Sequence, residues 1–97
     1  MPPKGPMVNE APSDYVNINT AVTTVVKASP GVLRRVVVNT SAAGSITIYN
    51  ALSATGTPVA ILKASVAEGT YEYNVRMNTG ITVVTGHNDQ DVTVVYD

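Results

Sequence analysis

Residues 70–77, with the sequence TYEYNVRM, alternate strictly between large apolar or aromatic side chains and polar ones. A period of two places successive side chains on opposite sides of an extended chain, which is the pattern of a β-strand with one buried and one solvated face. The side predicted to be buried comprises Tyr71, Tyr73, Val75 and Met77, and the solvated side comprises Thr70, Glu72, Asn74 and Arg76.

Similar short runs of Val, Ile, Thr and Tyr lie on both sides of this segment, separated by turns that contain Gly, Pro or Asn. No run shows a helical period with capping residues. The pattern predicts an all-β fold, an antiparallel β-sandwich, jelly-roll-like or Ig-like, of about seven strands. The expected strands span residues 21–28, 32–40, 45–50, 59–64, 70–77, 81–85 and 91–96.

The segment before these strands, residues 1–18, contains four prolines and Gly5 and has no sustained period. Proline removes backbone donors and favours an extended path. We expect an extended, Pro-rich N-terminal arm over residues 1–18 that tethers a β-sandwich domain, residues 19–97, which folds on its own. A disordered tail is the alternative. The apolar anchors of such a tether, and so the candidate partner contacts in the arm, are Val8, Tyr15, Val16 and Ile18.

The composition favours a module that packs against other proteins. Of the 97 residues, 44% are hydrophobic and 13% charged, about half the charged share of an average domain. Such a neutral surface suits subunit contacts. A net charge of -1 argues against nucleic-acid partners and anionic membrane surfaces, and no apolar segment predicts a signal peptide or a membrane span, so we expect synthesis in a cytoplasm.

Candidate chemistry is sparse. The chain has no Cys and a single His, His87, which lies in the segment GHNDQD at residues 86–91. The side-chain oxygens of this segment could bind a calcium ion. The segment lacks the ligand spacing of an EF-hand loop, however, so we interpret the segment as a polar hairpin turn. We predict no catalytic, cofactor-binding or metal-binding residues, no cofactor, and a protein that is not an enzyme.

Arg34 and Arg35 form the only pair of adjacent basic residues. Neighbouring side chains on a strand point to opposite faces, so we expect one arginine to pair with a carboxylate and the other to contact a partner. The five tyrosines are interpreted as core or rim residues. A sugar-stacking face is the alternative, weakened by the absence of Trp and Phe.

Three segments carry a resemblance to a known group of proteins. They are GVLRRVVVNTSAAGSITIYNALSATGT at residues 31–57, VAILKASVAEGTYEYNVRMNTGITVVTG at 59–86 and DVTVVYD at 91–97. From about residue 16 to residue 96 the chain resembles small phage and prophage structural proteins of the β-sandwich type, similar to capsid decoration (cement) proteins. No catalytic residues come with this resemblance.

The resemblance implies a structural virion protein of a tailed bacteriophage, made in the host cytoplasm and placed on the capsid surface. Its partners would be the major capsid protein, whose lattice it would stabilise, and neighbouring copies of itself in a homo-oligomer. A tail, neck or fibre-associated virion module is one alternative. A carbohydrate-binding or host-binding β-sandwich module is another.

Overall fold

The computed structural model describes residues 12–97, which form eight β-strands and no helix. Seven of them lie within two residues of the predicted segments, so the all-β prediction and these strands are confirmed. The strands are β1 (Asp14–Ile18), β2 (Val22–Lys27), β3 (Gly31–Thr40), β4 (Ile46–Tyr49), β5 (Ala60–Leu62), β6 (Gly69–Met77), β7 (Ile81–Thr85) and β8 (Asp91–Tyr96).

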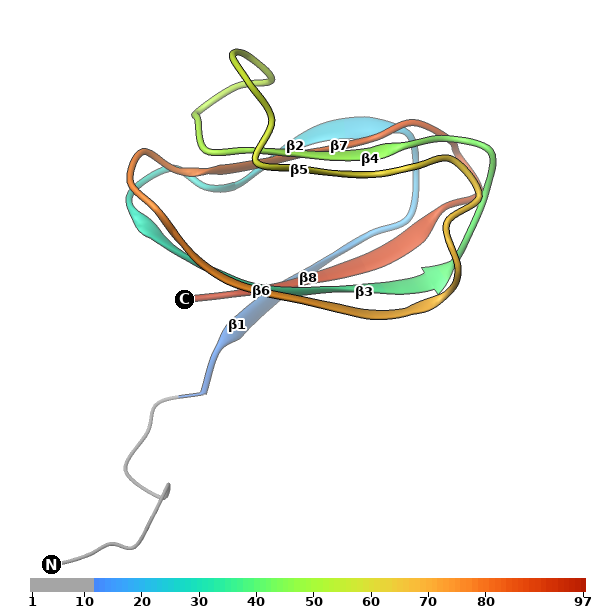
Figure 1. The fold of residues 1–97 in the computed structure, drawn as a ribbon, viewed down its shortest axis with the longest axis horizontal. Helices are drawn as coiled ribbons and strands as arrows, with labels where there is room; N and C mark the ends of the chain where they lie inside the picture. Colours follow the sequence, from blue (N-terminus) through green and yellow to red (C-terminus); the bar gives the residue numbers. More distant parts are fainter. Residues whose placement is uncertain (1–11) are drawn as a thin grey trace, which may run out of the picture.

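The strands form two four-stranded antiparallel sheets, β1-β8-β3-β6 and β2-β7-β4-β5, which stack face to face as a sandwich (Figure 1). Across the two sheets, β1 pairs with β8, β2 with β7, β3 with β6 and β4 with β5. This nested order is that of an eight-stranded jelly roll, one of the two topologies that the sequence left open.

The core lies between the two sheets and contains the inward side of each strand. Period-two alternation places Ile46 and Ile48 of β4 and Val92 and Val94 of β8 on the inward sides of their sheets, and all four side chains are fully buried. The β6 pattern behaves as predicted, because Met77 is buried while Tyr71, Tyr73 and Val75 pack against the core and the polar residues between them are exposed. These apolar contacts are the main source of stability in a domain of this size.

Two tyrosines of β6 line the rim of this core. The Tyr71 hydroxyl donates a hydrogen bond of 2.5 Å to the Ala67 carbonyl oxygen. Burial raises the pKa of the Tyr73 phenol above its usual value, and the nearby Tyr71 adds to this rise. Both residues therefore behave as core and rim side chains, as predicted, whereas Tyr15 is 71% exposed and the prediction is wrong for that tyrosine.

The predicted boundary between arm and domain is wrong for residues 14–18. These residues form β1, an edge strand that pairs with β8 from Asp14↔Tyr96 to Ile18↔Val92. Ile18 is only 4% exposed and belongs to the core, and Val16 packs against it, so both side chains anchor β1 to its own domain. The third expected anchor, Tyr15, is exposed, and Val8 lies outside the described residues.

We predict that a chain of residues 19–97 is much less stable than one of residues 12–97. The shorter chain lacks β1, which leaves the β8 edge unpaired and removes Ile18 from the core. Truncating a buried Ile to Ala alone costs about 2–5 kcal/mol, so losing the whole strand should lower the free energy of unfolding by at least that much. Urea denaturation followed by circular dichroism measures the difference. Equal midpoints for the two chains would show that β1 is dispensable.

Candidate functional site

The outer faces of the two sheets differ in charge. The strands of β1-β8-β3-β6 carry five charged residues on their outward side, Arg34, Arg35, Glu72, Arg76 and Asp91, and one more, Asp14, at the start of β1, whereas Lys27 is the only charged residue in β2-β7-β4-β5. The Lys27 side chain passes beside Gly31 at the start of β3, so it lies at the end of the sandwich. We call the outer face of β2-β7-β4-β5 the uncharged face.

The uncharged face is built from two rows of cross-strand neighbours. One row runs Thr23, Val84, Thr47, Ile61 and the other runs Val25, Thr82, Tyr49. Their neighbours along each strand, such as Ile46, Ile48 and Val83, point into the core. On this face Ile61 is 61% exposed and Val25 46%. These two side chains lie on the edge strands β5 and β2, and the uncharged side chains of β7 and β4 lie between them. The cores of protein interfaces are depleted in charged residues, so a face of this composition suits contact with another protein.

The loop between β4 and β5 extends this face. It rises above the sheet at one end of the sandwich (Figure 1) and carries the exposed side chain of Leu52. The Thr82 hydroxyl donates a hydrogen bond of 2.8 Å to the Ala51 carbonyl oxygen, which holds the base of the loop against β7. The loop contains no charged residue, so its surface is uncharged like that of the sheet below it.

One sequence signal for this face was missed. Residues 36–62 form a run of 27 positions without Asp, Glu, Lys, Arg or His, and residues 77–86 form a second uncharged run. These two runs contain β4, β5, β7 and the loop after β4. The average charge content of the chain concealed this asymmetry, whereas the spacing between charged residues would have revealed it.

The prediction that Arg34 and Arg35 point to opposite faces is wrong. Leu33 and Val36 are both fully buried, so the two arginines between them lie on the same outer face. The cause is a β-bulge, because the register of β3 shifts between Leu33 and Arg35 against both neighbouring strands. An extra residue at a bulge resets the alternation of side chains.

Both arginines bind carboxylates of their own chain. Arg34 Nε lies 2.6 Å from Asp97 Oδ2, and Arg35 Nε lies 2.9 Å from Glu72 Oε2. The expected pairing with a carboxylate is therefore found for both, and the expected partner contact of one arginine stays a prediction. Arg34 also holds the pKa of the Asp97 carboxyl below its usual value through this hydrogen bond, assisted by Ser13.

Polar side chains on the same outer face also satisfy one another. The side-chain amides of Asn17 on β1 and Asn39 on β3 both donate to Asp91 Oδ1, at 2.7 and 3.1 Å, and to Thr93 Oγ1, at 3.3 and 3.1 Å. Asp91 and Thr93 lie on β8, which runs between β1 and β3. Many polar side chains of the β1-β8-β3-β6 sheet therefore already have hydrogen-bond partners within the chain.

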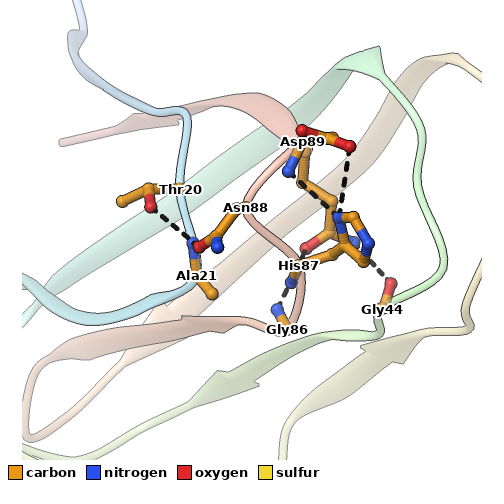
Figure 2. Close-up of polar contacts among 8 residues, drawn as sticks. Thr20, Ala21, Gly44, Gly86, His87, Asn88 and Asp89 are labelled. Atoms are coloured by element: carbon orange, nitrogen blue, oxygen red, sulfur yellow. Dashed lines mark hydrogen bonds and ion pairs between the residues drawn. The ribbon is translucent and has the colours of Figure 1, made fainter.

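The segment around His87 forms the predicted turn and links three parts of the chain (Figure 2). Gln90 is only 2% exposed; its Oε1 accepts from the backbone N–H groups of Gly86 and His87, at 3.0 and 3.1 Å, and its Nε2 donates to the Gly44 carbonyl oxygen. Sequence reasoning gave Gln90 no role, because a glutamine in a turn is usually exposed.

The other side chains of this turn are also engaged within the chain. Asn88 Oδ1 accepts from the Thr20 hydroxyl and the Ala21 N–H, both at 3.2 Å, and His87 Nδ1 accepts from the Asp89 N–H at 3.0 Å (Figure 2). Over residues 12–97, no three His, Asp or Glu side chains come close enough together to hold a metal ion. The same residues enclose no pocket and contain no helix that is long and apolar enough to cross a bilayer.

We predict that Gln90→Leu destabilises the protein by about 2–4 kcal/mol, because it leaves the buried Gly44 carbonyl without its partner and removes the acceptor of the part-buried Gly86 and His87 N–H groups. The matched control is Asp89→Ala, whose exposed side chain should be worth less than about 0.5 kcal/mol. Thermal melting measures both variants. A chelator should leave the melting temperature unchanged, and a sharp fall on chelation would contradict the interpretation as a turn.

We predict that acid weakens the domain partly through Asp97. The pKa of this carboxyl is lowered in the folded state, so its contribution to stability is present above the unfolded pKa and is lost as pH falls through the lower folded value. Asp97→Asn should therefore flatten the fall in melting temperature at acid pH. The control is Asp89→Asn, in an exposed carboxylate, which should keep the wild-type profile. Identical profiles for Asp97→Asn and wild type would refute the role of this pair.

No protein-family model, no curated protein and no solved structure matches this chain. The jelly-roll topology is therefore established here by strand order and register. The resemblance to small phage structural proteins stays a prediction.

Proposed function

We propose that this protein is a structural component of a tailed-phage virion, a capsid decoration protein that binds the lattice of the major capsid protein and stabilises the head. The main observation that supports this proposal is the uncharged face. It is a sheet surface, extended by the β4–β5 loop, with exposed Ile61 and Val25 and with no charged side chain in its cross-strand rows. The jelly-roll topology also supports it, because viral capsid domains are among the proteins that use this topology.

Desolvation favours this face over the opposite one as the docking surface. The cores of protein interfaces are depleted in charged residues, since burying an ion costs several kcal/mol unless it is well paired. Covering the uncharged face buries no charged side chain of its strands or its loop, because the accessible side chains are uncharged, Val, Ile, Thr and Tyr on the strands and Leu52 among those of the loop, while Thr82 is already buried. Covering the other face would desolvate Arg34, Arg35, Glu72 and Arg76. The partner surface that fits best is therefore an uncharged protein surface.

The size of the uncharged face suits a protein that binds in many copies. Four strands spaced about 4.8 Å apart, each about five residues long at about 3.3 Å per residue, give a projected area of roughly 300 Å². A stable two-protein complex usually buries about 800 Å² on each partner. A single contact through this face is expected to be weak, and a capsid lattice would supply the avidity that makes many such contacts effective.

We predict that Ile61→Lys and Val25→Lys abolish binding to phage heads without unfolding the domain. Each substitution places one charge on an edge strand of an otherwise uncharged contact, and its burial should weaken binding at least tenfold, or about 1.4 kcal/mol. The matched control is Thr70→Lys, at an exposed position on β6 in the other sheet. Co-sedimentation of each variant with heads of the encoding phage that lack the protein measures binding, and circular dichroism checks folding.

The number of copies of this protein per purified virion tests whether it is located on the head or on the tail. Hundreds of copies per particle are expected on a capsid lattice, whereas six or twelve would indicate the tail or neck and would contradict the decoration role. Full head occupancy by Ile61→Lys, together with loss of binding by Thr70→Lys, would show that the protein docks through the other face. Absence of the chain from purified particles would remove the proposed function altogether.

A further inference from the structure

We propose that the free edge of β1 is a self-association site, through which two copies pair their β1 strands antiparallel about a twofold axis. The two β1-β8-β3-β6 sheets then form one continuous eight-stranded sheet. This inference rests on the geometry of the sheet edges. It does not depend on what the uncharged face binds.

The sandwich has four edge strands, β1 and β6 in one sheet and β2 and β5 in the other. An edge strand presents unpaired backbone N–H and C=O groups, which can pair with a strand of another chain. Proteins usually block such edges with β-bulges, charged side chains, proline or very short strands. The four edges can therefore be compared by the features that would prevent pairing.

Three of the edges carry such features. In β6, Asn74 has a left-handed backbone conformation (φ 54°) at a register shift, and Glu72 and Arg76 flank it. In β2, the register shifts between Val25 and Lys27, and the strand ends on that lysine. The β5 strand has only three residues.

The β1 edge carries none of them along its length. Its five residues pair with β8 without any shift of register, from Asp14↔Tyr96 to Ile18↔Val92. Asp14, at the very start of the strand, is its only charged residue, and the nearest proline, Pro12, lies outside the strand. Within residues 12–97 no strand pairs with the other side of β1.

A second observation points to the same edge. Tyr15 lies on β1 and is 71% exposed, more than any other large apolar side chain of the described residues. Its cross-strand neighbour is Val95, whose side chain is half-buried on the outer face of the sheet. Tyrosine is enriched at protein interfaces because it supplies a large contact area at a low cost in conformational entropy. An open backbone edge and an exposed aromatic ring thus coincide.

The sequence of β1 is compatible with pairing to itself. Full overlap of five residues about a twofold axis places Val16 opposite Val16 of the second copy, Tyr15 opposite Asn17, and Asp14 opposite Ile18. No like charges then face each other, because the two Asp14 residues lie at opposite ends of the paired strands, about 13 Å apart along the strand direction. The contact is small, so we expect a weak, concentration-dependent dimer.

Sedimentation equilibrium of the full chain, from about 1 μM to about 1 mM, tests the association. The wild type should shift from monomer toward dimer. The double variant Tyr15→Lys/Asn17→Lys should stay monomeric over the whole range, because lysines would stand directly opposite each other in two cross-strand pairs. Thr70→Lys, on the β6 edge of the same sheet, is the matched control and should dimerise like the wild type.

Disulfide cross-linking tests the register and does not require the double variant to fold. The chain has no native cysteine, so single cysteines can be placed cleanly. Directly opposed residues in an antiparallel pair have Cα atoms about 4.5–5.5 Å apart, within the reach of a disulfide, whereas residues offset by two positions are beyond it. An oxidised mixture of Tyr15→Cys and Asn17→Cys chains should therefore give at least tenfold more covalent dimer than either variant alone.

Three results would overturn the proposal. They are a wild type that remains monomeric at about 1 mM, a Tyr15→Lys/Asn17→Lys variant that associates as strongly as the wild type, and cross-linking of the mixture at the level of Thr70→Cys, the control on β6. None of these results bears on capsid binding, since the uncharged face lies on the other sheet. Loss of capsid binding by Ile61→Lys would in turn leave dimerisation intact.

Discussion

The packing of the two sheets against each other is the interaction on which the rest of this structure depends. Each strand supplies one side of its alternating side chains to a shared core, in which residues such as Ile48, Val83 and Val94 are fully buried. Because this core needs only the inward face of each sheet, the two outward faces and the four edges are free to differ. In this chain the two outward faces differ in charge, and the four edges differ in the features that block strand pairing.

On the outer face of β1-β8-β3-β6 the charged and polar side chains pair with one another, whereas the opposite face leaves apolar side chains exposed. The arginines at the β3 bulge bind Glu72 and Asp97, and Asp91 accepts amide donors from two neighbouring strands. The opposite face offers apolar side chains and threonines, among which Ile61 remains largely exposed. This asymmetry supports the proposal that the uncharged face, and not the charged one, docks on another protein. The β1 edge adds a direction of contact within the plane of the other sheet.

Much of the fold follows from sequence patterns, since seven strands were located by a period of two and by Gly and Pro turns. The β1 strand was missed because its five residues follow a Pro-rich segment and are too short to establish a period. The joint orientation of Arg34 and Arg35 depends on a bulge, and a bulge arises from how three strands pair, which local sequence does not encode. The uncharged face required strand pairing as well, because only the register brings Thr23, Val84, Thr47 and Ile61 into one row.

The most direct test of this account is a cryo-electron microscopy reconstruction of the encoding phage's virion at a resolution that distinguishes the two sheets. We predict that β2-β7-β4-β5 lies against the major capsid protein, with Ile61 and Val25 in the contact, and that Arg34 and Arg35 face away from the shell. A map in which β1-β8-β3-β6 lies on the shell while the uncharged face points to solvent would contradict the account.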